Sequence, residues 1–196
     1  MALLNEKSSY TLIDYEKLCE TTKEGKVEFN NGGILLSSNS SITHNIIIQN
    51  ISKNINDKID TTKCRAFSEM IEIAIDKENG EQYRYKPDIF VICKNREGSF
   101  ERKGQSFTSV PLLVFEVVSK SNFRDDIIIK RDSYARIGIK EYNLVHQDGR
   151  IEQLELSGEY YITKKLYEKD DVYNSFIFDN LKIKLQDIFD GIEDFI

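Results

Sequence analysis

The chain has 196 residues, of which 40% are hydrophobic and 31% charged, and its formal net charge is -6. This composition suits a globular chain with a buried core, and it excludes wholesale disorder and a protein that coats nucleic acid by charge alone. We therefore expect a single domain over residues 1–196. The longest apolar run, Val110 to Val118, is far shorter than the roughly 20 residues of a membrane helix, so we expect no membrane partner.

The first residues and the cysteines predict a cytoplasmic protein. The N-terminal stretch contains Glu6 and Lys7 and lacks the apolar run of a secretory signal. Cys19, Cys64 and Cys93 are odd in number, widely spaced and form no CxxC pair. We therefore predict reduced, half-buried thiols rather than a disulfide framework or a zinc site.

The first third of the chain predicts a helix, a hairpin and a second helix. Residues 11–24 have apolar positions near helical period and capping-box-like spacing at their start. Residues 26–37 alternate around an Asn-Asn-Gly-Gly turn, which is typical of a hairpin. Residues from about 41 to 59 carry isoleucines at helical intervals, and they predict the second helix.

The middle of the chain predicts three strands and one loop. Residues 65–75 and 86–93 predict strands, the second with an almost wholly apolar run. Residues 94–109 are polar and contain glycine, and they predict a loop. Residues 111–119 form the most hydrophobic strand, so we expect a central strand covered on both faces.

The last third predicts a helix followed by further strands. The predicted elements are a helix at 124–137 ending at Gly138, strands at 141–145, 150–156 and 160–163, a segment at 176–185 that closes the sheet, and a short helix at 185–189. The order of elements predicts an α+β fold of α/β/α-like form. In this fold a mixed central β-sheet is flanked by helices.

Two acids stand at unusual positions in the apolar strands. Asp88 follows Pro87 and precedes an apolar run, and Glu116 interrupts the run from Val110 to Val118. A carboxylate in an apolar strand is costly unless it is paired or binds a metal. Strands separated by one loop tend to be neighbours, so both acids are expected to meet and to bind Mg²⁺ or Mn²⁺. Taken singly, each acid is also compatible with a turn cap or a surface ion pair.

The helix that follows adds Asp126, Lys130 and Tyr134, which stand four residues apart and share one face. If this face covers the Glu116 strand, Lys130 reaches a metal-bound water. The alternative is an exposed Asp–Lys pair of little energetic value. Residues 101–140 carry eight basic against five acidic residues, a locally basic strip that suits a nuclease but is also an ordinary fluctuation.

The strings YKPDIFVIC, VPLLVFEVVSKS and DIIIKRDSYARIGIKEYNLV together resemble the Uma-two family, a group of restriction-endonuclease-like proteins in the PD-(D/E)XK phosphodiesterase superfamily. KVEFNNGGILL resembles the glutamate-containing hairpin of that family, and SSNSSITHNIII resembles its serine-rich stretch and histidine-bearing helix. NLKIKLQDIF resembles its closing segment, so the resemblance covers nearly the whole chain. It implies a restriction-endonuclease-like core.

The resemblance also implies roles for particular residues. Asp88 and Glu116 become the two acids of the superfamily motif, and Glu28 becomes an upstream acid that supports the metal site. Lys130 becomes the catalytic lysine. Accessory positions are His44, Asp126, Tyr134 and Lys120, of which His44 is equally compatible with local packing or capping.

This chain departs from the superfamily pattern in two places. Val118 occupies the position where the standard spacing puts lysine, so Lys130 is an inferred substitute, with Lys120 as the rival. Asn143 and His146 stand where the family commonly has Trp and Asp, and neither position is needed to bind the metal.

These patterns predict a Mg²⁺- or Mn²⁺-dependent endonuclease acting on DNA. Glu28, Asp88, Glu116 and the carbonyl of Val117 would hold the metal, and Lys130 would assist the attacking water. The expected phosphate contacts are Lys120, Arg124, Arg131 and Arg136. Pairing of two copies is expected of such endonucleases, and the sequence leaves it open.

Three alternatives stay open. The fold is also compatible with a catalytically silent module that binds nucleic acid or a protein partner. It is compatible with an interaction module that has no nucleic-acid role. The acidic balance makes a metal-dependent hydrolase of small phosphoesters a further alternative.

Overall fold

The computed structural model describes residues 2–4, 9–38, 40–118 and 123–193, and it confirms the predicted α+β class. Within these residues the helices are α1 (Leu12–Thr21), α2 (Ile42–Lys58), α3 (Phe123–Ile137) and α4 (Leu185–Ile188). None of these helices is long and apolar enough to cross a membrane.

The larger helices enclose a sheet that, in the described part of the chain, has six strands in the order β13-β12-β11-β10-β7-β4. The bounds are β4 Cys64–Ser68, β7 Ile89–Cys93, β10 Leu113–Val118, β11 Glu141–His146, β12 Arg150–Ser157 and β13 Tyr160–Tyr167. Strands β10 and β11 are parallel, and the other neighbours are antiparallel. The predicted central strand, β10, indeed lies between two others.

A second sheet contains the N-terminal hairpin. Its described strands follow the order β1-β3-β2-β6-β5-β9-β8. They are β1 Ala2–Leu4, β2 Lys26–Asn30, β3 Gly33–Ser37, β5 Ile73–Asp76, β6 Gln82–Tyr85, β8 Arg102–Lys103 and β9 Ser106–Phe107. A small third sheet pairs β14 (Val172–Asn174) with β15 (Lys182–Lys184).

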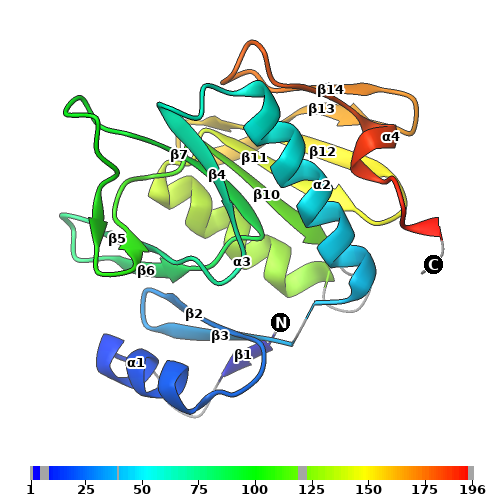
Figure 1. The fold of residues 1–196 in the computed structure, drawn as a ribbon. Helices are drawn as coiled ribbons and strands as arrows, with labels where there is room; N and C mark the ends of the chain where they lie inside the picture. The colour runs from blue at the N-terminus through cyan, green and yellow to red at the C-terminus, as the bar shows by residue number, and fades with distance from the viewer. Residues whose placement is uncertain (1, 5–8, 39, 119–122, 194–196) are drawn as a thin grey trace.

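Helices α2 and α3 cover opposite faces of the six-stranded sheet, with α2 in front and α3 behind in Figure 1. Because strand side chains alternate, Phe115 and Val117 of β10 pack with Ile51 of α2, whereas Val114 packs with Tyr134 of α3. Glu116 shares the α3 face with Val114. The alternation therefore sends an acid into the layer between sheet and helix.

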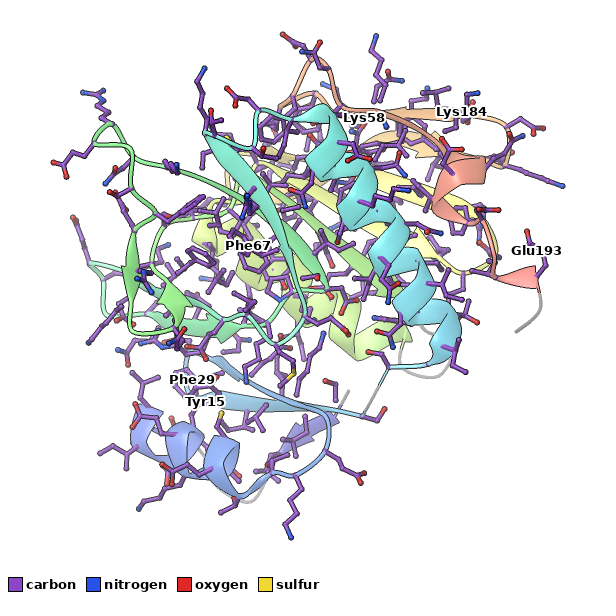
Figure 2. All side chains as sticks on the ribbon, viewed as in Figure 1. Tyr15, Phe29, Lys58, Phe67, Lys184 and Glu193 are labelled. Atoms are coloured by element: carbon purple, nitrogen blue, oxygen red, sulfur yellow. A yellow bond between two sulfur atoms is a disulfide. The ribbon has the colours of Figure 1, made fainter. Side chains whose placement is uncertain are left out.

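The N-terminal helix packs on the hairpin as a third apolar cluster. Tyr15 of α1 and Phe29 of β2 lie between these elements, their ring centres 6.0 Å apart (Figure 2). The predicted capping box forms at Thr11 and Asp14, and the hairpin turns at Asn31 and Gly32, both with positive φ. This packing fixes the strand that carries Glu28.

The prediction of one strand over residues 65–75 is wrong. The chain ends β4 at Ser68, turns at Glu69 and Met70 with positive φ, and begins β5 in the other sheet. The apolar alternation continues through the turn, so the sequence pattern hides the break. The turn places Glu69 at the start of β7, where the Glu69 N–H donates to the carbonyl of Asp88.

The expectation of three reduced thiols is also wrong. Cys64 and Cys93 face each other in the antiparallel pairing of β4 and β7, and they form a disulfide. The two cysteines are 29 residues apart, so no CxxC signal marks them. The sheet register is what brings them together. Cys19 is a free thiol.

Two other segments differ from the prediction. The segment at 176–185 does not close the central sheet, since β15 pairs with β14 instead. The predicted loop at 94–109 contains the two-residue strands β8 and β9. Short pairings of this kind depend on neighbouring strands rather than on local propensity.

The packing of α2 on the sheet makes a stability prediction. Ile51 is fully buried, whereas Ile42 of the same helix is 60% exposed. Ile51→Ala should lower the free energy of unfolding by about 3 kcal/mol because it leaves a cavity. Ile42→Ala, the matched control, should change it by less than about 0.5 kcal/mol. Urea denaturation measures both, and equal losses would contradict this packing.

Candidate functional site

The register of the central sheet brings Asp88 and Glu116 together. Strand β7 pairs with β10 up to Ile89 and Phe115, so Asp88 comes just before the last pair and Glu116 just after it. Beyond this pair the Asp88 side chain substitutes for a strand partner, because its Oδ2 accepts a hydrogen bond of 2.9 Å from the Val117 N–H. Both acids are therefore held by the sheet at one point.

Helix α3 places two donors on Glu116. Lys130 Nζ lies 3.0 Å from Glu116 Oε2, and the Tyr134 hydroxyl donates to Oε1 at 2.6 Å. The predicted shared face of Lys130 and Tyr134 therefore covers the Glu116 strand. All three side chains are buried.

Glu28 reaches the same point from β2. It is fully buried, and its Oε1 accepts a 2.7 Å hydrogen bond from the Lys86 N–H. Its Oε2 makes no hydrogen bond and lies 3.5 Å from Lys130 Nζ. The structure thus brings Glu28, Asp88, Glu116 and Lys130 into one cluster, while their chemical roles stay predictions.

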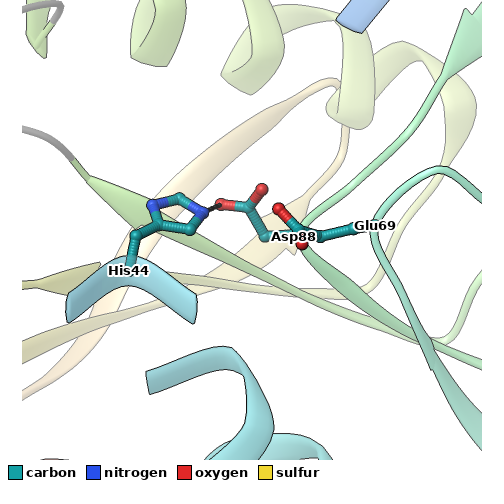
Figure 3. Close-up of side chains that lie close together, drawn as sticks. All are labelled: His44, Glu69 and Asp88. Carbon is teal, nitrogen blue, oxygen red and sulfur yellow. Dashed lines mark ion pairs between the residues drawn. The ribbon is translucent and has the colours of Figure 1, made fainter. Parts of the chain in front are cut away.

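Three further side chains surround Asp88. Lys26 Nζ lies 2.7 Å from Asp88 Oδ1 and 3.7 Å from Glu69 Oε1. His44, in the first turn of α2, has its Nε2 3.1 Å from Asp88 Oδ2. Figure 3 shows His44, Glu69 and Asp88 converging from three separate segments.

The electrostatics of the two central acids differ. Burial opposes ionisation of Asp88, but the neighbouring Lys26 ammonium and His44 hold its pKa well below the usual range. Burial raises the pKa of Glu116 to about 8, and the charges of Asp88 and Glu28 add to this rise despite the nearby Lys130. Burial lowers the pKa of Lys26, but the charge of Asp88 overcomes this and raises it.

The cluster has the composition of a cation site. Together with the neighbouring Lys26 and Glu69, it contains four carboxylates, Glu28, Glu69, Asp88 and Glu116. Its lysines among the described residues are Lys26 and Lys130. If all four acids ionise, two negative charges are left without a lysine, and one divalent ion would balance them; the raised pKa of Glu116 reflects this excess of acids. The buried Glu28 Oε2 without a hydrogen bond is a second sign that a hard, oxygen-preferring cation fits here.

Glu141 shows what a structural buried acid looks like in this chain. It is fully buried, and it accepts hydrogen bonds from Gln153, Ser175 and the Phe176 N–H, at 2.7, 2.7 and 3.2 Å, and from the Tyr173 hydroxyl. Neutral donors thus saturate both of its oxygens and tie β11 to the C-terminal segment. Glu28 lacks such saturation.

The predicted phosphate contacts do not all face outward. Arg131 donates a 2.8 Å hydrogen bond to the Tyr161 carbonyl, and Arg136 lies 3.4 Å from Glu81 Oε1 while remaining 61% exposed. Lys120 lies outside the described residues. The side chains of Arg124 and Asp126 are likewise outside what the structure describes, although their backbone belongs to α3.

Sequence reasoning missed Lys26 and Glu69. Lys26 stands two residues before Glu28 in a strand, so period-two alternation places both on one face and was an available signal. Glu69 carried no local signal, because it lies inside an apolar alternation that was predicted as a strand. Only the positive-φ turn reveals its position.

The Tyr134 hydrogen bond makes a prediction about the site. Tyr134→Phe removes a donor from a buried carboxylate and should lower the free energy of unfolding by about 1–3 kcal/mol. The exposed Tyr160 is the control, and Tyr160→Phe should change stability by less than about 0.5 kcal/mol. Chemical denaturation without added metal measures both variants. An unchanged free energy of unfolding in Tyr134→Phe would contradict a stabilising hydrogen bond between Tyr134 and Glu116.

Comparisons with known proteins agree on the fold. A crystal structure described as "a putative nuclease belonging to DUF820" from Anabaena variabilis ATCC 29413 superposes with a TM-score of 0.70. The alignment covers 92% of this chain and 97% of that chain at 17% sequence identity. A comparison with curated proteins found no match.

The family comparison covers most of the chain. Residues 12–185 match the Uma2 (Uma-two) family, which is described as "Putative restriction endonuclease". The matched range contains the hairpin, α2, the central strands and α3, so it includes every residue of the cluster. The sequence resemblance is thereby confirmed, and the chain belongs to the Uma2 family.

Proposed function

We propose that this chain is a metal-dependent endonuclease that hydrolyses phosphodiester bonds of DNA. The observation that carries the proposal is the convergence of Glu28, Asp88, Glu116 and Lys130 in a buried cluster with excess negative charge. Membership of the Uma2 family supports a nuclease. Perturbed, buried ionisable groups at one point are typical of catalytic sites.

Asp88 and Glu116, helped by Glu28 and the Val117 carbonyl, would hold Mg²⁺ or Mn²⁺. When bound, such an ion binds the scissile phosphate and lowers the pKa of the attacking water. The Val117 N–H fixes one Asp88 oxygen, while Tyr134 and Lys130 fix the two oxygens of Glu116. This support keeps the acids in place before the substrate arrives.

Lys130 is the proposed catalytic lysine. Its ammonium lies between Glu116 and Glu28, at 3.0 and 3.5 Å. From there it would orient the attacking water and stabilise the negative charge that develops on the phosphate oxygens. The preceding segment, with Lys120 and Arg124, would add phosphate contacts. Of the predicted phosphate contacts whose side chains the structure describes, Arg136 is the exposed one.

The net charge of -6 and the internal hydrogen bond of Arg131 also favour a second candidate, a hydrolase of small phosphoesters. Such a substrate needs the same acids and lysine without a long basic surface. The DNA proposal further includes pairing of two copies, so that two sites reach both strands. It also includes a cytoplasmic setting, which no longer rests on reduced cysteines because Cys64 and Cys93 form a disulfide.

The test is cleavage of supercoiled plasmid DNA by the full chain with Mg²⁺ or Mn²⁺. Glu116→Gln and Lys130→Met should each lower the rate by about 10² or more, because they remove a metal ligand and a charge-stabilising group. Gel electrophoresis follows nicking and linearisation, and circular dichroism confirms folding.

The chain offers a matched control pair. Glu155 and Lys164 form an exposed ion pair of 2.6 Å on β12 and β13, so Glu155→Gln and Lys164→Met should leave the rate unchanged. Metal-dependent hydrolysis of bis(p-nitrophenyl) phosphate without DNA cleavage would favour the small-phosphoester candidate. Cleavage that survives Glu116→Gln and Lys130→Met would contradict the proposed site.

A further inference from the structure

The side chains of His44, Glu69 and Asp88 meet on the side of Asp88 that faces α2. One ligand atom from each lies within 4.8 Å of the others. The three residues come from the first turn of α2, the turn after β4 and the residue before β7. Three independent segments therefore converge on one point beside the Glu116 cluster.

The histidine is oriented as a ligand would be. The Ser41 hydroxyl caps α2 by accepting from the His44 N–H at 3.2 Å, which fixes the first turn. The imidazole Nε2 is buried and lies 3.1 Å from Asp88 Oδ2, which is an ion-pair distance when the ring carries a proton there. A nitrogen this close to a carboxylate oxygen needs a cation between the two atoms, which is a proton on the imidazole in the metal-free chain and would be the metal ion at the proposed site.

Glu69 is held in place for the same point. Its N–H donates to the Asp88 carbonyl at 3.2 Å, and the Ser40 hydroxyl donates to its Oε1 at 2.8 Å. Such outer hydrogen bonds orient metal-binding carboxylates. The positive φ of Glu69 places its side chain beside Asp88 rather than along β4.

Lys26 supplies a second, independent observation. Its ammonium lies between the two carboxylates, 2.7 Å from Asp88 Oδ1 and 3.7 Å from Glu69 Oε1, and its side chain is only 11% exposed. The pair of acids therefore already binds a cation from the chain itself. A divalent ion at this point would displace one positive charge and gain two carboxylates and an imidazole.

We propose that His44, Glu69 and Asp88 form a second cation site, which takes a divalent transition-metal ion in competition with the Lys26 ammonium. The imidazole nitrogen favours a transition metal over Mg²⁺, which prefers oxygen ligands alone. Asp88 would supply a ligand to both sites. The site does not depend on DNA cleavage, and it can exist whether or not the proposed function holds.

The test uses Mn²⁺ binding to the full chain without DNA. Titration calorimetry gives the affinity, and electron spin echo modulation detects nitrogen bound to Mn²⁺. The chain has two histidines, so His146→Gln is the matched control and should keep the nitrogen signal. His44→Gln should abolish that signal and weaken Mn²⁺ binding about tenfold. Glu69→Gln should also weaken Mn²⁺ binding about tenfold.

Lys26→Met removes the competing ammonium and should tighten Mn²⁺ binding by about tenfold, a gain that misfolding cannot imitate. Mn²⁺ binding without nitrogen modulation, or modulation that survives His44→Gln, would overturn the proposal. Unchanged affinity in Lys26→Met would also overturn it. A wild-type chain that cleaves no DNA with Mg²⁺ or Mn²⁺ but keeps the nitrogen signal would contradict the proposed function and leave this site standing, so the two proposals fail separately.

Discussion

The structure depends on the burial of carboxylates at the end of the central sheet. Glu28, Asp88 and Glu116 are almost fully withdrawn from water, and each must be held by donors or cations to remain there. The Val117 N–H, the Lys86 N–H, Tyr134, Lys26 and Lys130 do this. These donors come from β2, the segment before β7, β10 and α3. The site therefore forms only where these four parts of the chain pack together.

The two faces of the sheet carry different parts of this constraint. On the α2 face, apolar residues of β7 and β10 such as Val91 and Phe115 pack against the helix, and the first turn of α2 brings His44 to Asp88. On the α3 face, aromatic rings lie beside the buried acid Glu116. The ring of Tyr134 packs against Tyr85 and Tyr142, and its hydroxyl donates a hydrogen bond to Glu116. One residue thus links packing to the chemistry of the cluster.

Much of the fold followed from local patterns, whereas the complete cluster did not. The helices and the central strand were predicted because their periodicity and capping signals are strong, as at Thr11 and Ser41. Asp88 and Glu116 stood out as acids in apolar strands. Glu69 and the Cys64–Cys93 disulfide were missed because a turn with positive φ and a strand register are set by tertiary contacts.

The central claim is that the buried acids form a divalent cation site. A crystal structure of the full chain with Mn²⁺, with anomalous scattering data, tests it most directly. The account predicts an anomalous peak within about 2.5 Å of carboxylate oxygens of both Asp88 and Glu116, the range of direct metal–oxygen bonds. Ordered side chains in the present arrangement with no peak at either acid, at saturating Mn²⁺, would contradict it.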